Sequence, residues 1–303
     1  MEFHVMLADM KMESGTDNRE GTTDGRFRVD DFEIEYSSRG TGEPLMFVHG
    51  GFLTSWFDPM SKEVALSERY RLISYHRPGY GRSSNPLAPV TVGDQARWGL
   101  ALLHHLGVER AHIVGHSIGG CFALQMALDA PDAVKSLALL EPPVMSAVTD
   151  LSGMQALREA GPRWQQGDTK GAVDLFMKGM VDPEYQKFFE DTSPHGIQEV
   201  LDGAKAFFTT DQPAVQAWKF SAAQAAQITQ PVLLVIGDGS ERVNPIRSQV
   251  QRSLLAWLPN AQPFILPDAT HLLPLQKPAE LAKALVAFYD RIGSPSAGEE
   301  IRR

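Results

Sequence analysis

Short apolar runs alternate with amphipathic helical stretches along most of this chain, and that alternation restricts its fold more than any other feature. The runs are almost continuously apolar, which is typical of strands buried on both faces of a parallel sheet. A repeated strand–helix order predicts an α/β protein with a mostly parallel, doubly wound sheet of about eight strands. The apolar runs lie at residues 45–48, 71–75, 111–114, 136–140, 232–236 and 264–266, and the helical stretches at 92–106, 120–128, 246–258 and 278–292.

Three segments fall outside this alternation. Residues 1–24 show neither a helical nor a strand period, so we expect a flexible N-terminal tail, and we expect a second tail at 293–303. Residues 145–227 contain no convincing buried strand and carry aromatic side chains at helical spacing. We interpret them as a helical cap inserted between two parts of one core, 25–144 and 228–292.

A strict polar–apolar alternation precedes the first apolar run. Phe32, Ile34 and Tyr36 alternate with acidic or hydroxyl residues, which gives a strand with one dry and one wet face. An Asp-Asp pair separates this segment from a shorter one at 26–29. The pattern predicts a β-hairpin over residues 26–37.

Charge and cysteine content exclude several classes of protein. Asp and Glu total 37 against 28 Lys and Arg, for a net charge of −9, and no run is rich in basic residues. Nucleic acids and anionic membranes need a concentrated positive field, so we expect neither as a partner. Cys121 is the single cysteine, which excludes an intrachain disulfide, a thiolate zinc site and an iron–sulfur cluster. With no apolar leader and no run of about 18 apolar residues, we expect a cytoplasmic protein.

The sequence Gly-His-Ser-Ile-Gly-Gly at 115–120 lies between a predicted strand and a predicted helix. A sharp turn there would hold Ser117 in a strained conformation, with its hydroxyl exposed above the carboxyl edge of the sheet. Glycines flank the serine because a side chain there would collide with neighbouring backbone. The amide of Ile118 would stand at a helix N-terminus, where it can donate to an oxyanion. We therefore interpret Ser117 as a nucleophile rather than a helix N-cap.

Two further motifs follow the first two apolar runs. A His-Gly-Gly sequence stands at 49–51, and Arg-Pro-Gly-Tyr-Gly-Arg-Ser stands at 77–83. Together with the serine turn, they make the chain resemble the α/β-hydrolase fold over about residues 26–292. The resemblance implies that a backbone N–H of Gly51 or Phe52 is the second oxyanion donor. It also implies that the loop at 77–83 is structural.

The same resemblance places the base, because the family's chain order is serine, acid, histidine. Of nine histidines, His271 follows the last predicted strand and precedes the last predicted helix. Its expected role is to take the serine proton during attack and to return it to the leaving group. The family usually has glycine before this histidine, and this chain has Thr270.

The acid has three candidates. The family's usual acid follows the strand at 232–236, but the residue at the expected position is Ser240, which cannot supply a negative charge. Glu241 and Asp238 lie in the same loop. Glu141 instead follows the apolar strand before it, where a charge is costly unless it is paired or used. Some α/β hydrolases place their acid there, so we favour Glu141 and leave Glu241 and Asp238 as alternatives.

These residues favour a serine hydrolase that acts by acyl transfer on a small carboxylic ester, with no metal or organic cofactor. We expect His49, Trp56 and His116 beside the substrate pocket. A C–C bond hydrolase of ring-cleavage products, a cofactor-free perhydrolase and a ligand-binding protein on a hydrolase scaffold stay open as alternatives. The expected partner is a small-molecule substrate, and a homodimer is left open.

Overall fold

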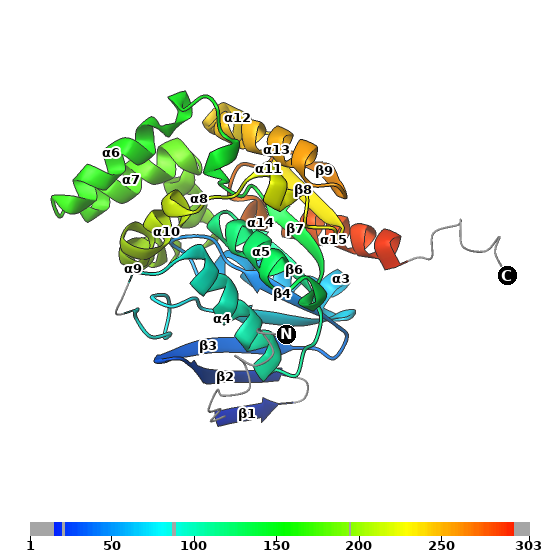
Figure 1. The fold of residues 1–303 in the computed structure, drawn as a ribbon. Helices are drawn as coiled ribbons and strands as arrows, with labels where there is room; N and C mark the ends of the chain where they lie inside the picture. The colour runs from blue at the N-terminus through cyan, green and yellow to red at the C-terminus, as the bar shows by residue number, and fades with distance from the viewer. Residues whose placement is uncertain (1–14, 20–21, 87–88, 194, 294–303) are drawn as a thin grey trace.

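One sheet of nine strands organises the part of the chain that this computed structural model describes, residues 15–19, 22–86, 89–193 and 195–293. The strand order is β1-β2-β3-β5-β4-β6-β7-β8-β9. From β5 to β9 neighbouring strands run parallel, whereas β1, β2 and β3 form an antiparallel edge (Figure 1). The strands are β1 (Gly15–Arg19), β2 (Thr22–Val29), β3 (Phe32–Arg39), β4 (Glu43–Val48), β5 (Tyr70–Tyr75), β6 (Ala111–His116), β7 (Val134–Leu140), β8 (Val232–Gly237) and β9 (Ala261–Leu266).

The six apolar runs all lie inside strands β4 to β9, and this confirms the mostly parallel sheet. Every residue of β6 and β8 is buried, as expected for central strands with helices on both faces. The hairpin is also confirmed, because β2 and β3 pair antiparallel around the Asp-Asp turn.

Helices connect the parallel strands. Around the sheet these are η1 (Ser55–Phe57), α2 (Asp58–Ser61), α3 (Val64–Ser67), α4 (Val92–His105), α5 (Ile118–Asp129), η2 (Pro131–Ala133), α12 (Ser240–Val243), α13 (Ile246–Trp257), α14 (Leu273–Gln276) and α15 (Pro278–Gly293). Between β7 and β8 they are η3 (Met145–Ala147), η4 (Ser152–Met154), α6 (Gln155–Gln165), α7 (Thr169–Met180), α8 (Tyr185–Thr192), α9 (Gly196–Ala206), the π-helical turn η5 (Phe207–Asp211), α10 (Gln212–Ala217) and α11 (Ala222–Ala225).

The helices from α6 to α10 gather at one end of the molecule, away from the edge that β1 forms (Figure 1). We call residues 145–227 the inserted segment. Its described secondary-structure elements are all helices. None of the described helices is long and apolar enough to cross a membrane.

The prediction of a flexible N-terminal tail over residues 1–24 is wrong for residues 15–19 and 22–24. Residues 15–19 form β1 and residues 22–24 begin β2, whereas 1–14 and 20–21 lie outside the described residues. Pairing of β1 with β2 uses backbone hydrogen bonds, which need no apolar period in the sequence. In the predicted C-terminal tail, Gly293 ends α15 and the rest also lies outside the described residues.

Candidate active site

Ser117 occupies a sharp turn between β6 and α5. Its φ of 52° is in the left-handed region, which a serine rarely adopts without compensating support. Support comes from close packing under the turn, where a Cβ on Gly119 would lie 2.2 Å from the carbonyl oxygen of Val48. A Cβ on Gly115 would lie 2.6 Å from the carbonyl oxygen of Gly119. The two glycines therefore let helix and strand approach closely enough to form the turn.

His271 and Glu141 meet at the carboxyl edge of the sheet. Nδ1 of His271, in the loop after β9, lies 2.6 Å from Oε2 of Glu141, which directly follows β7. The second carboxylate oxygen accepts a hydrogen bond from the Gly237 N–H at 2.9 Å. Both side chains are buried, and Glu141 has a φ of 51°. A buried carboxylate with all these partners holds the imidazole in one orientation and one tautomer.

The two alternative acids lie elsewhere. Asp238 and Glu241 are both exposed, and neither contacts His271. Ser240, between them, is fully buried. The structure thus brings His271 to Glu141 and to neither of the residues in the later loop.

Arg247 is a member of this cluster that the sequence analysis did not single out. Its Nε lies 2.7 Å from Oε2 of Glu141 and 3.1 Å from Nδ1 of His271, and its Nη2 donates to the carbonyl oxygen of Met180. Nδ1 of His271 and Nε of Arg247 both donate to Oε2 of Glu141. Their 3.1 Å separation is therefore a contact between two donors that share one acceptor, and not a hydrogen bond between them. Arg247 lies in the first turn of α13, just after Pro245, and that position carries no motif that could have marked it.

Electrostatics favour a neutral imidazole at this site. Burial lowers the pKa of His271 well below its ordinary value of 6.5, and the positive charge of Arg247 lowers it further. Burial likewise lowers the pKa of His116, with His271 as the next cause. A neutral His271 is the form that can accept a proton from a serine hydroxyl.

A cavity of about 80 Å³ joins Ser117 to this cluster. Its wall is mostly apolar, and roughly half of it comes from the inserted segment. The lining residues are Ser117, Ile118, Glu141, Pro142, Pro143, Met145, Met154, Leu157, Phe176, Met180, Phe207, Gln212, Val215, Gln216, Asn244, Ile246, Arg247, Val250 and His271.

The pocket prediction for three residues is wrong, because His49, Trp56 and His116 do not line this cavity. Each is buried and bonded to backbone. Trp56 donates from Nε1 to the Gly51 carbonyl at 2.8 Å, and Nε2 of His116 donates to the His271 carbonyl at 3.0 Å. Their role is to hold the loops that carry Gly51 and His271.

His49 is held by the loop at 77–83. Its Nε2 accepts from the Arg77 N–H at 3.1 Å, so Nδ1 carries the proton and donates to the Gly50 carbonyl. Burial lowers the pKa of His49 well below 6.5, and Arg77 adds to that effect. His49 thus orders backbone as a neutral side chain.

The inserted segment is bonded to the loop after β4 at one place and to the loop after β5 at another. Glu199 of α9 accepts from the N–H and hydroxyl groups of both Thr54 and Ser55. Asp211, at the end of η5, pairs with Arg77 at 2.6 and 2.9 Å and accepts from the Tyr80 hydroxyl at 2.5 Å.

The same Tyr80 hydroxyl lies 3.3 Å from the Phe52 amide nitrogen and accepts from it. Phe52 has a φ of 68° and stacks on Phe207 with the ring centroids 4.1 Å apart. The backbone at Gly51 and Phe52 is therefore fixed from both sides, by the sheet loops and by the inserted segment.

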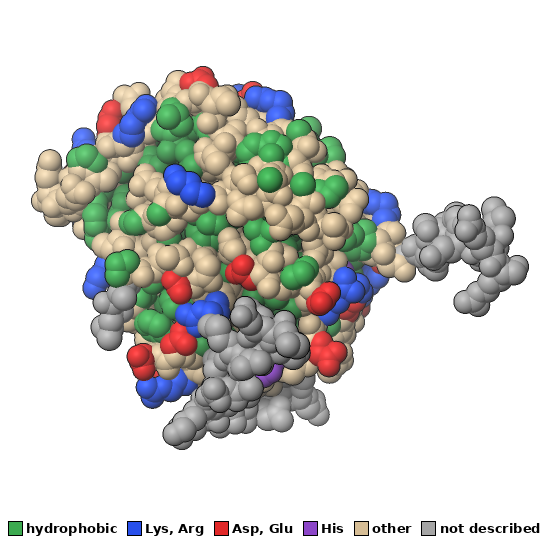
Figure 2. All heavy atoms as spheres, viewed as in Figure 1, with side chains coloured by type: hydrophobic (Ala, Val, Ile, Leu, Met, Phe, Trp, Pro, Cys, Tyr) green, Lys and Arg blue, Asp and Glu red, His purple; other side chains and the backbone are tan. Residues whose placement is uncertain are grey.

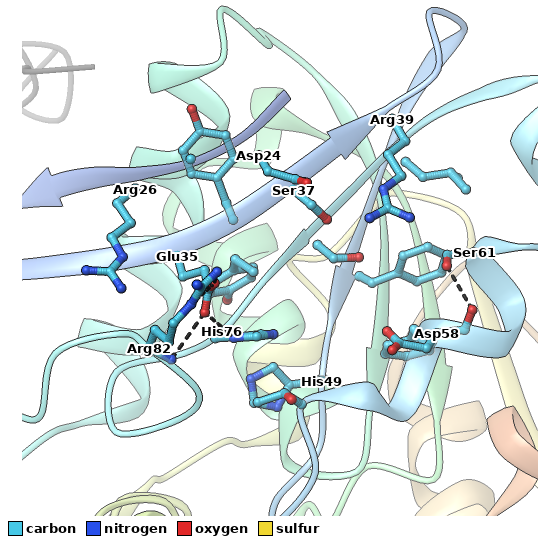
Figure 3. Close-up of a pocket in the computed structure, with 18 of the residues that line it drawn as sticks. Asp24, Arg26, Glu35, Ser37, Arg39, His49, Asp58, Ser61, His76 and Arg82 are labelled. Carbon is cyan, nitrogen blue, oxygen red and sulfur yellow. Dashed lines mark hydrogen bonds and ion pairs between the residues drawn. The ribbon is translucent and has the colours of Figure 1, made fainter. Parts of the chain in front are cut away.

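A larger groove of about 960 Å³ opens elsewhere, against β2, β3 and β5. Figure 3 shows Glu35 with His76 and Arg82 at one side and Asp58 with Ser61 at the other. The Glu35 carboxylate is already paired with both His76 and Arg82, and the Ser61 hydroxyl donates to the Asp58 carbonyl. Neither Ser117 nor the His271–Glu141 pair lines this groove, so the smaller cavity is the better candidate for chemistry.

Neither charge on the face shown in Figure 2 nor metal-ligand clustering among the described residues marks another site. On the face shown in Figure 2, basic and acidic side chains are interspersed rather than gathered by sign. Within the described ranges, no group of three or more His, Cys, Asp or Glu residues is placed to hold a metal ion.

Comparison with known proteins assigns the family. The model of the alpha/beta hydrolase fold matches residues 43–278, which is more than half of the chain. The chain belongs to the α/β-hydrolase family. It is a hydrolase by that membership and by the hydrolases it resembles.

The individual proteins that this chain resembles share modest sequence identity with it or match only part of it. The acetyltransferase component of the acetoin cleaving system from Cupriavidus necator is 38% identical over 117 residues, which are 38% of this chain but only 30% of that protein. An uncharacterized hydrolase of Bacillus subtilis, YugF, is 26% identical over 87% of this chain and 96% of its own length. A thermophilic esterase from Thermogutta terrifontis has a TM-score of 0.74 at 19% identity, covering 94% of this chain and 100% of that one, and this likeness shows the fold alone.

Proposed function

We propose that this protein is a serine esterase that hydrolyses a small carboxylic ester through Ser117, His271 and Glu141. The observation that carries the proposal is the 2.6 Å contact between Glu141 and His271 at the cavity that Ser117 also lines. Serine at the sharp turn supplies a nucleophile that can form an acyl-enzyme. Membership of the α/β-hydrolase family supports a hydrolytic reaction.

In the proposed reaction, His271 takes the proton of the Ser117 hydroxyl through Nε2 as the serine oxygen attacks the ester carbonyl. Glu141 stays ionised, accepts from Nδ1–H and stabilises the imidazolium that forms. His271 then gives its proton to the leaving alcohol, and an acyl-enzyme remains on Ser117. Water attacks that ester in a second cycle of the same proton transfers and releases the acid.

The oxyanion of each tetrahedral intermediate needs two donors. Ile118 is the first residue of α5, so its N–H has no acceptor one turn earlier in the helix. For the second donor we propose Gly51 rather than Phe52, because the Phe52 N–H already donates to the Tyr80 hydroxyl. Such preorganised donors contribute most to acyl transfer when they are aimed at the developing charge.

We propose that the inserted segment acts as a cap that limits the acyl group. A cavity of about 80 Å³ is much smaller than the ~300–1,000 Å³ of typical ligand pockets. Phe176 and Phe207 of the inserted segment lie on its wall. A short acyl chain fits this space better than a long one.

Hydrolysis of p-nitrophenyl esters from acetate to decanoate tests the proposal. We expect kcat/KM to be highest for the shortest chains and to fall steadily as the acyl group grows. The Ser117→Ala variant, folded by circular dichroism, serves as the control and should lose the activity. Turnover that is equal in wild type and Ser117→Ala would contradict the proposed nucleophile, and no turnover of any ester would contradict the esterase function.

A further inference from the structure

Arg247 lines the cavity and keeps one donor without a hydrogen-bond partner among the described residues. Its side chain is only 10% exposed, and two of its three nitrogens are occupied, Nε by Glu141 and Nη2 by the Met180 carbonyl. No described residue accepts a hydrogen bond from Nη1, which is itself buried. Buried guanidinium groups are normally bonded at every nitrogen that water cannot reach, so an unused Nη1 on a side chain that lines the cavity points to a ligand acceptor.

The charges around the cavity favour an anionic group in front of Nη1. Glu141 and Arg247 are the two lining residues with a formal charge among those described, apart from the titratable His271. Both oxygens of Glu141 are already engaged, one by Gly237 and the other by His271 and Arg247. An incoming carboxylate therefore has a guanidinium donor available, and an incoming ammonium group has no free acceptor of opposite charge there.

The rest of the wall limits what can carry that anion. Apolar side chains such as Met154, Leu157 and Val250 make up most of it, and the free volume is about 80 Å³. Two amides of the inserted segment, Gln212 and Gln216, also line the cavity. A short methylene chain that ends in a carboxylate matches an apolar wall with one guanidinium donor.

We propose that Arg247 is a specificity-determining residue that binds a carboxylate on the acyl part of the substrate, so that the preferred substrates are monoesters of short dicarboxylic acids. This rests on the proposed esterase function. Nη1 takes the carboxylate, while Ser117 attacks the ester carbonyl at the other end of the acyl chain. Arginine suits this role because its planar, permanently charged group recognises carboxylates with strong hydrogen bonds.

Matched pairs of ethyl esters test the proposal. Monoethyl succinate, glutarate and adipate are compared with ethyl butanoate, pentanoate and hexanoate, in which a methyl group replaces the carboxylate, and ethanol release is followed for each. For the best-fitting chain length we expect kcat/KM to favour the monoanion by about 10-fold or more in wild type. Because Arg247 touches Glu141, its variants should slow both esters of a pair, so the readout is the ratio within each pair.

Three variants test whether the preference for the monoanion depends on Arg247. Arg247→Met should lower the ratio to one or below, and Arg247→Lys should retain part of the preference. Arg252→Met is the matched control, because Arg252 is an exposed arginine on the same helix, and its ratio should equal that of wild type. A wild-type ratio of one or less at all three chain lengths would overturn the proposal, as would a ratio that Arg247→Met leaves unchanged.

A binding measurement separates this inference from the esterase function. Glutarate is titrated calorimetrically into Ser117→Ala and into Ser117→Ala with Arg247→Lys or Arg247→Met, whichever folds. We expect binding in the first and at least about 10-fold weaker binding in the second. Absence of glutarate, succinate and adipate binding to Ser117→Ala would overturn the inference. Binding that depends on Arg247 would support it even if the ethyl esters were not hydrolysed, an outcome that counts against the esterase function alone.

Discussion

Oε2 of Glu141 lies 2.6 Å from Nδ1 of His271, although 130 residues separate the two along the chain. Strand β7 delivers the carboxylate and the loop after β9 delivers the imidazole, and both end at the same edge of the sheet. A buried, ionised carboxylate at that distance orients the ring and stabilises its protonated form. The acid that we propose for this chain therefore follows β7, whereas the family's usual position is after β8.

Replacing that carboxylate should remove most of the activity. For Glu141→Gln we expect kcat to fall by about 10²–10⁴-fold, because an amide in its place favours the wrong tautomer of His271. Glu241→Gln and Asp238→Asn are the matched controls, since both side chains are exposed and away from His271. Steady-state kinetics on one p-nitrophenyl ester measures all three. A large loss in either control with a near-normal Glu141→Gln would refute the assignment.

The pH profile should report the low pKa of His271. Burial and Arg247 hold that pKa well below 6.5, so kcat/KM should stay constant from pH 8 down through 6.5 and fall only at lower pH. Arg247→Met removes one of the two causes, so the acid limb should move to higher pH. A wild-type limb centred at or above 6.5 would contradict this electrostatic account.

The same shift has a consequence for stability. In the unfolded chain His271 binds a proton near its ordinary pKa of 6.5, whereas in the folded chain it stays neutral to lower pH. As the pH falls below 6.5, the unfolded state therefore binds more protons than the folded state does. Over that window the titration of His271 lowers the free energy of unfolding. Above 6.5 the imidazole is neutral in both states and contributes no pH dependence.

Asp211 should be essential for the attachment of the inserted segment. It and Arg77 are both fully buried, and the Tyr80 hydroxyl completes the cluster. Asp211→Asn leaves a buried guanidinium without its counter-charge, which should cost about 3–5 kcal/mol of the free energy of unfolding. Urea denaturation measures this, with Asp202→Asn on the exposed face of α9 as the control. Equal loss in both variants would contradict the role of the pair.

Gly203 and Gly161 offer a matched pair of glycines in helices of the inserted segment. A Cβ on Gly203 would lie 1.8 Å from the Phe52 carbonyl oxygen, whereas a Cβ on Gly161 would meet nothing within 4 Å. Gly203→Ala should therefore push α9 off the loop that carries Gly51 and lower both stability and kcat/KM. Gly161→Ala should change stability much less, since the better helix propensity of alanine is offset by the clash of its Cβ with the ring of the following Pro162. The reverse order of the two variants would contradict the described packing.

The fold was predictable from the sequence because continuous apolar runs mark the central strands of a parallel sheet. Strand β1 was not, since Gly15–Arg19 is polar and its pairing depends on backbone atoms. Ser117 and His271 carry local signals, the glycines of a sharp turn and a position between the last strand and the last helix. The carboxylate that pairs with His271 is decided by how remote segments of the chain come together in the fold. The sequence alone therefore left three candidates.

Side-chain roles that depend on burial were the hardest to predict. His49, Trp56 and His116 stand in or next to motifs in the sequence, yet each forms a hydrogen bond to backbone and its ring is enclosed. Arg247 had no local signal at all, because only the folded chain places the first turn of α13 against Glu141. The sequence motifs identified the loops that surround the site. They did not identify which side-chain atoms face the cavity.

Covalent labelling tests the central claim, that Ser117 is an activated nucleophile, most directly. Wild-type protein is treated with a small fluorophosphonate, digested and analysed by mass spectrometry. We expect one adduct, on the peptide that contains Ser117, with loss of labelling in Ser117→Ala and much slower labelling in His271→Ala. Labelling at another residue, or none on folded wild-type protein, would contradict the account.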